Sequence, residues 1–149
     1  MPEALFRNIV FKALIIYEKN NGSVYHYTLK ERLDKEFEER EENFIFEVVA
    51  MIDSPQATLE KLRDFKPDFV IVDFSALVKI SFNTLIKELI ESPYRPKETI
   101  VINIEHNMVR EVIKYQQNAY LAYIHKGPDM TSDLINVLGN LWVRRHQYA

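Results

Sequence analysis

Cysteine is absent from the 149-residue chain, and glycine is scarce, with only three residues. Without cysteine there is no disulfide, no thiol nucleophile and no cysteine-based zinc site, which fits a reducing cytoplasm. The three glycines, at positions 22, 127 and 139, lie too far apart to build a glycine-rich phosphate loop. The usual dinucleotide and nucleoside-triphosphate fingerprints are therefore excluded, and no serine-centred nucleophile elbow supports a hydrolase.

An excess of positive charge and a long apolar segment are also missing. The formal net charge of −3 argues against a general nucleic-acid binder, which would carry a basic patch. The amino-terminal stretch MPEALFRNIVFKALIIY is interrupted by Glu3, Arg7 and Lys12, so it predicts neither a signal peptide nor a membrane span. The four histidines lack metal-ligand spacing. We therefore expect a cytoplasmic protein that binds neither nucleic acid nor membrane.

Short aliphatic runs alternate along the chain with segments of helical periodicity. We predict strands at residues 9–17, 44–51, 69–72, 99–104 and 120–125. Helices are predicted at residues 27–39, 55–66, 81–91 and 107–118, and at a final segment around 134–142. This alternation implies a parallel sheet covered on both faces. The predicted fold is α/β, a doubly wound five-stranded parallel sheet in a flavodoxin-like three-layer sandwich, formed by a single domain over residues 1–149.

The stretch PDFVIVD, residues 67–73, is the predicted centre of this sheet. Its continuously apolar, mostly β-branched run at 69–72 is typical of a strand buried on both faces. Asp73 follows the run, and in open α/β sheets ligands and chemistry collect beyond the carboxyl ends of the strands. An aspartate in this position also starts a turn or caps a helix. Both interpretations of Asp73 remain open at this point.

Two more charged residues follow predicted strands: Glu18 the first and Lys126 the fifth. Together with Asp73 they resemble the receiver domain of bacterial response regulators, over nearly the whole chain. The resemblance implies that Asp73 accepts a phosphoryl group and that Lys126 contacts it. It also implies that Glu18, Asp73 and the backbone carbonyl of Ser75 hold Mg²⁺. Magnesium and an ammonium group would neutralise the charge that develops when a carboxylate attacks a phosphoryl donor.

Two further positions match the switch residues of that family. Asn103 lies at or beside the Ser/Thr position that ends the fourth strand, and Tyr123 lies three residues before Lys126, where an aromatic switch residue is common.

The chain also departs from the receiver pattern. The acidic pair is reduced to Glu18, which should weaken magnesium binding, and no other cofactor is expected. The segment after Asp73 reads FSALVKISF in place of the usual Met-Pro turn, Asn103 replaces Ser/Thr, and Gly127 separates Lys126 from the following proline. Such losses resemble the atypical or pseudo-receivers, which keep the fold and bind partners without the ordinary phosphorylation switch.

We therefore expect a stand-alone, receiver-like signalling domain of the two-component type that acts through protein–protein interaction. No enzymatic activity is expected beyond self-phosphorylation and dephosphorylation at Asp73. The resemblance points to a histidine kinase, a downstream target or a second copy as partner, docking on the fourth helix, fifth strand and fifth helix. Tyr115, Tyr120 and Tyr123 lie in this region. The alternatives are a magnesium-dependent phosphoacceptor of a phosphorelay and, less favoured, a flavodoxin-like small-molecule or flavin binder.

Overall fold

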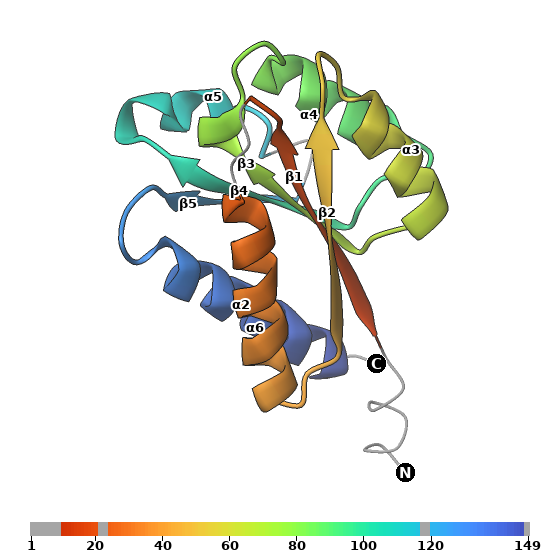
Figure 1. Ribbon diagram of the computed structural model, residues 1–149, viewed down its shortest axis with the longest axis vertical. Coiled ribbons are helices and arrows are strands. Elements are labelled where there is room, and N and C mark those ends of the chain that lie inside the picture. The colour runs from red at the N-terminus through yellow and green to blue at the C-terminus, as the bar shows by residue number, and fades with distance from the viewer. Residues whose placement is uncertain (1–9, 21–23, 117–119, 148–149) are drawn as a thin grey trace.

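A five-stranded, all-parallel sheet forms the centre of the molecule (Figure 1). The computed structural model describes residues 10–20, 24–116 and 120–147. The strands follow the order β2-β1-β3-β4-β5, which is the flavodoxin-like order. Their bounds are β1 Phe11–Glu18, β2 Phe44–Met51, β3 Phe69–Asp73, β4 Glu98–Ile104 and β5 Leu121–His125.

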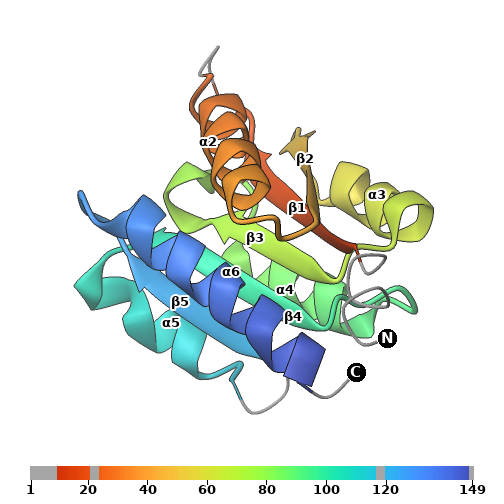
Figure 2. The ribbon, with the colours of Figure 1, turned by 90° about the horizontal axis from the view of Figure 1, so that it is seen from below.

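Helices cover both faces of the sheet (Figures 1 and 2). Helices α2 (Tyr25–Glu39) and α6 (Met130–Gln147) lie on one face, and α3 (Gln56–Phe65), α4 (Phe82–Glu91) and α5 (Val109–Ile113) lie on the other. Two short 3₁₀ turns, η1 (Phe74–Ala76) and η2 (His106–Met108), follow β3 and β4. The predicted doubly wound, three-layer α/β architecture is confirmed. None of the helices in the described part of the chain is both long and apolar enough to cross a membrane.

The buried strand β3 joins the two hydrophobic cores. Phe69 and Ile71 pack into the core beneath α2 and α6. Val70 and Val72 pack into the core beneath α3, α4 and α5. This division follows from the alternation of side chains along a strand, and it explains why the run is apolar at every position. Asp73, the last residue of the strand, is therefore fixed at the carboxyl edge of the sheet centre.

Three helices differ clearly from their predicted bounds, and the last of them, α6, runs from Met130 to Gln147 in place of the predicted segment around 134–142. The first begins at Tyr25, two residues before the predicted start, and so includes His26. The helix predicted over residues 107–118 is reduced to η2 and the single turn-and-a-half of α5, and residues 117–119 lie outside the described part. Within α5 only Val112 is buried, and Ile113 is 45% exposed. A helix with so little buried surface gains little stability from tertiary packing. The helical spacing of its apolar residues was therefore not enough to give the longer helix that was predicted.

Helix α3 ends with a strained residue. Lys66 adopts the left-handed conformation (φ 52°, ψ 60°), from which its N–H donates to the carbonyl of Leu62 at 3.0 Å. The left-handed region is unfavourable for residues with a Cβ atom, and glycine is the usual residue at such helix ends.

We predict that Lys66→Gly is more stable than Lys66→Ala by about 1 kcal/mol, because both variants lose the side chain but only glycine relieves the backbone strain. Urea unfolding of the two variants measures this difference. Equal stabilities would contradict the strain at this helix end.

Candidate functional site

A pocket of about 550 Å³ opens where the carboxyl ends of β1, β3 and β4 meet. The first turn of α2 and the loop after β5 complete its walls. Glu18, Asp73, Asn103 and Lys126, which the sequence placed separately at strand ends, all line this pocket. Its volume lies within the range of about 300–1,000 Å³ that is typical of small-ligand sites.

Asp73 is the best-enclosed carboxylate of the pocket, with an exposed fraction of 2%. Its Oδ2 atom lies 2.7 Å from Nε2 of His26. Its Oδ1 atom accepts hydrogen bonds from the N–H of Ser75 at 3.1 Å, the hydroxyl of Ser75 at 2.7 Å and the side-chain amide of Asn103 at 3.2 Å. The bond to the N–H of Ser75 caps η1, so the interpretation of Asp73 as a turn-starting residue is confirmed.

These contacts keep Asp73 ionised. Burial by itself raises the pKa of a carboxyl group, since it penalises the charged form. The hydrogen bonds from His26, Ser75 and Asn103 outweigh that effect and hold the pKa of Asp73 below its ordinary value.

His26, in the first turn of α2, lines the pocket and contacts Asp73, and the sequence prediction did not include it in the site. It is 4% exposed, and the ring of Tyr17 stacks on it with centroids 3.8 Å apart and an interplanar angle of 9°. Tyr25 meets the imidazole edge-on at 5.0 Å. A signal did exist, since His26 extends the buried stripe formed by Leu29 and Leu33 by one helical step.

The contact with Asp73 places a proton on Nε2 of His26. An ionised carboxylate can only accept, so Nε2 must carry a proton and donate it to Asp73. Nδ1 is buried and has no hydrogen-bond partner among the described residues. The geometry therefore assigns the Nε2 proton of His26 to the hydrogen bond with Asp73.

Glu18, the second buried carboxylate, binds the loop that follows η1. It is 3% exposed, and its oxygens accept from the backbone N–H groups of Val78 at 3.1 Å, Lys79 at 2.9 and 3.0 Å and Ile80 at 2.6 Å. Burial raises the pKa of Glu18, but the bonds from Ile80, Lys79 and Val78 outweigh it and lower the pKa overall. The side chain of Glu18 thereby links β1 to this loop through hydrogen bonds.

Asn103 reaches Asp73 through a distortion of β4. The residue has a positive φ of 58°, and the register between β4 and β5 shifts between Val101 and Ile104. Asparagine tolerates the left-handed region better than most residues, and a bulge of this kind redirects a side chain. The redirected amide donates to Asp73 and, at 3.4 Å, to the hydroxyl of Tyr25. Burial, with the charge of Asp73, raises the pKa of Tyr25, so its phenol stays protonated.

The remaining predicted residues have different outcomes. Lys126 is exposed and lines the pocket, and its ammonium makes no ion pair with the described residues. Ser75 also lines the pocket, where its N–H and hydroxyl bind Asp73. Tyr123 is half-buried and packs into the core beneath α3, α4 and α5, and it does not line the pocket.

Magnesium fits this donor set poorly. The oxygens of Glu18 are engaged by backbone N–H groups, and those of Asp73 by three side chains and one N–H group. Across the described residues, no three histidine, aspartate or glutamate side chains are grouped so as to hold a metal ion. Magnesium binding by Glu18, Asp73 and the carbonyl of Ser75 therefore stays a prediction, and a metal would have to displace existing contacts.

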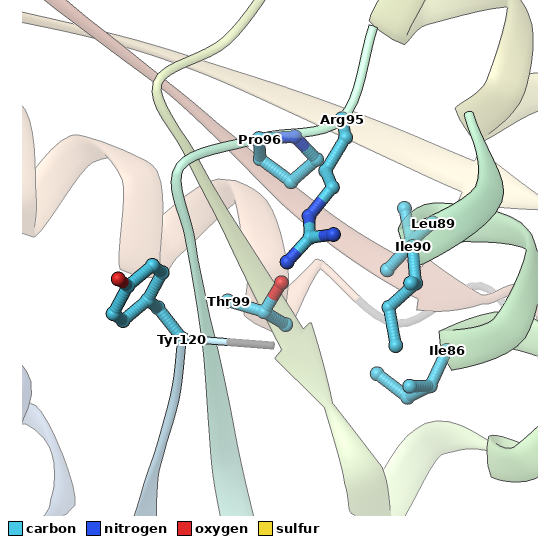
Figure 3. A pocket seen from close by; sticks show the side chains of 7 residues that line it. All are labelled: Ile86, Leu89, Ile90, Arg95, Pro96, Thr99 and Tyr120. Carbon is cyan, nitrogen blue, oxygen red and sulfur yellow. The ribbon is translucent and has the colours of Figure 1, made fainter. Parts of the chain in front are cut away.

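A second hollow lies at the opposite end of the sheet, where β4 begins (Figure 3). Apolar side chains of α4 and the residues Arg95, Pro96, Thr99 and Tyr120 surround it. Its volume of about 10 Å³ is roughly that of one water-sized probe. This hollow is too small to bind a ligand.

The hydrogen bonds between Glu18 and the loop after η1 lead to a prediction about stability. Glu18→Gln should lower the free energy of unfolding by about 2 kcal/mol at pH 7, because an amide loses the charge-assisted bonds and its NH₂ group opposes backbone donors. Urea unfolding measures the change. The exposed Glu91 provides the control, and Glu91→Gln should stay within about 0.5 kcal/mol of wild type.

The contribution of Glu18 to the free energy of unfolding should depend on pH and should decrease in acid. The folded-state pKa of Glu18 is depressed, so its contribution is fully present above the unfolded value of about 4.3 and is lost as the pH falls through the folded value. The stability gap between wild type and Glu18→Gln should therefore narrow in acid. A stability difference between wild type and Glu18→Gln that stays the same from pH 7 down to acidic pH would contradict the lowered pKa of Glu18.

The contact between His26 and Asp73 can be measured by a double-mutant cycle. His26→Phe keeps an aromatic ring against Tyr17 but removes the hydrogen bond, and Asp73→Asn removes the charge. We expect a coupling of about 2 kcal/mol, because the bond is buried and charge-assisted. The cycle that pairs His26→Phe with Glu91→Gln should be additive within about 0.5 kcal/mol. Additivity in the first cycle would show that the contact does not stabilise the fold.

Comparison with known proteins found no match for this chain among protein-family models, curated proteins or solved structures. The strand order and the site residues therefore carry the functional argument by themselves, and a fold of this kind supports many unrelated functions.

Proposed function

We propose that this chain is a receiver-like signalling domain of the two-component type that acts through protein–protein contacts. In this proposal Asp73 stays an ionised carboxylate that does not accept a phosphoryl group. The observation that carries the proposal is the buried contact of 2.7 Å between His26 and Asp73. A carboxylate that attacks a phosphoryl donor needs an accessible oxygen. Asp73 has an exposed fraction of only 2%, so a donor reaches it only if His26 moves away.

The charge of Asp73 is stabilised within the domain. In a phosphorylated site, a metal ion and an ammonium group would neutralise the carboxylate and the arriving phosphoryl group. Here the N–H of His26 and the amide of Asn103 already donate to the two oxygens. Lys126 stands at the pocket, but its ammonium makes no hydrogen bond to Asp73. These donors, which already engage both oxygens of Asp73, support a fixed, pseudo-receiver state over a phosphorylation switch.

The proposed partner surface lies around α5, β5 and α6, and the partner is a histidine kinase or a downstream signalling protein. Of the three tyrosines in this region, Tyr115 donates its hydroxyl to Asn83 at 2.5 Å, and Tyr123 is half-buried in the core. Tyr120 is 75% exposed. Aromatic residues are enriched in protein interfaces, so Tyr120 is the best candidate for a direct partner contact.

A second candidate is a magnesium-dependent phosphoacceptor that takes part in a phosphorelay. It is favoured by the meeting of Asp73, Glu18 and Lys126 at one pocket. It requires that His26 leaves Asp73 and that Glu18 leaves its loop. The pocket volume of about 550 Å³ also supports the less favoured small-molecule or flavin binder. A colourless purified protein would argue against a bound flavin.

The test treats the purified chain with a small acyl phosphate in the presence and absence of Mg²⁺, followed by intact mass spectrometry. Wild type and Asp73→Asn should both remain unmodified, while a phosphorylatable receiver domain treated in parallel gains one phosphoryl group. The expected result follows from the enclosure of Asp73 by His26. A magnesium-dependent gain in wild type that is absent from Asp73→Asn would overturn the pseudo-receiver proposal in favour of the phosphoacceptor.

A further inference from the structure

We propose that two copies of this chain pair through their β2 edges, antiparallel and related by a two-fold axis, to form one continuous sheet. The proposal rests on β2 and α2 and is independent of the function proposed for the Asp73 pocket. The partner is therefore a second copy of this chain, joined by main-chain hydrogen bonds of the kind used in strand addition.

The outer edge of β2 carries a row of unsatisfied backbone groups. In a parallel ladder, alternate residues direct both their N–H and their C=O to the same neighbouring strand. The carbonyls of Asn43 and Met51 accept from β1, and the register is continuous between them. Odd-numbered residues of β2 therefore bond to β1, and the even-numbered ones point away from the sheet. Phe44, Phe46, Val48 and Ala50 have no backbone partner on that side among the described residues.

This edge lacks the features that normally prevent strands from pairing. Natural edge strands are short, bulged, or carry lysine or proline. Strand β2 is eight residues long, has no bulge, and reads FIFEVVAM. Its one charged side chain, Glu47, is paired with Lys61 of α3 at 2.6 Å. The other edge strand, β5, has five residues, an irregular register and a following lysine. Among the described residues, β5 is therefore the protected edge and β2 the open one.

Charge selects the register of the pairing. If the two-fold axis passed beside Glu47, the two copies of this glutamate would lie directly opposite each other, which is destabilising. An axis at Val48 places Glu47 opposite Val49 of the second copy. In that register Phe46 lies opposite Ala50, a large side chain against a small one, and the paired residues exchange about six hydrogen bonds.

Helix α2 supplies the complementary charge. It packs over β2 (Figure 2), and the ring centroids of Phe37 and Phe44 lie 4.5 Å apart. Its carboxyl end and the residues that follow carry five glutamates within residues 36–42, and no basic residue lies in its last turn. Negative charge at a helix carboxyl end opposes the helix dipole. Arg40 pairs with Glu36 at 3.1 Å, and the other glutamates of this segment leave an excess of negative charge at the helix end within one copy.

Pairing of the two β2 edges relieves this pattern. The two-fold axis makes the α2 helices antiparallel, so each acidic end faces the amino half of the other helix. That half carries Lys30, which is paired with Asp34 at 2.6 Å, and Arg32, with Glu31 as its one acidic residue. Positive side chains and the positive end of the helix dipole then meet the glutamates. The α2 charges and the β2 edge thus point to the same antiparallel partner.

The experiment combines oligomeric state with amide hydrogen exchange of the intact wild-type chain. Sedimentation velocity over a range of concentrations should show a reversible dimer. Under dimer conditions the outward amides of Val48 and Ala50 should exchange at least about tenfold more slowly than after dilution. The inward amides of Glu47 and Val49 should be protected at both concentrations and serve as the internal control. A monomer at every concentration, or rapid exchange at Val48 and Ala50 in the dimer, would overturn the proposal.

A proline variant tests the edge directly. Ala50→Pro removes an outward N–H without breaking a bond to β1, and proline is tolerated at such edge positions. It should be monomeric with an unchanged circular dichroism spectrum, whereas Ala50→Ser, which keeps the N–H, should remain dimeric. A folded Ala50→Pro that still dimerises would show that another surface is used. If Ala50→Pro does not fold, the exchange experiment on wild type decides the question.

Discussion

The pocket of this protein depends on one buried contact, that between the imidazole of His26 and the carboxylate of Asp73. It joins the first turn of α2 to the end of the central strand β3, two segments that are 47 residues apart in the chain. Because a buried carboxylate without a partner is strongly destabilising, the position of α2 and the ionised state of Asp73 depend on each other. Ser75 and Asn103 complete the same network from η1 and the bulged end of β4.

The two buried carboxylates show how partners determine the role of a residue. Both Asp73 and Glu18 lie at strand ends, where an α/β sheet usually carries its chemistry. In this structure the backbone of the loop after η1 surrounds Glu18, and side-chain donors surround Asp73. Each carboxylate is thereby stabilised in its charged form, and each is also held in place. Their hydrogen bonds also fasten loops and a helix to the sheet.

Helix α2 connects the two parts of the molecule for which we make proposals. Its first turn contributes His26 and Tyr25 to the pocket, and its length packs over the edge strand β2. A partner that contacts α2 along the β2 edge therefore acts on the same rigid element that closes over Asp73. Tyr17, stacked on His26, ties this first turn to β1 as well.

The sequence by itself determined the elements, the sheet type and the meeting of the strand-end residues. Aliphatic runs such as 69–72 are readable as buried strands, and the carboxyl ends of parallel strands must share one edge, so Glu18, Asp73 and Lys126 were expected to meet there. Only the tertiary structure decided what each side chain contacts. Helix α2 begins at Tyr25, two residues before the predicted start, and so includes His26, which contacts Asp73. Glu18 accepts hydrogen bonds from the loop after η1, and the sequence of that loop has no periodic pattern that predicts this contact. Spacing fixes which residues lie at an edge, whereas the packing of distant segments fixes the direction in which each polar group finds its partner.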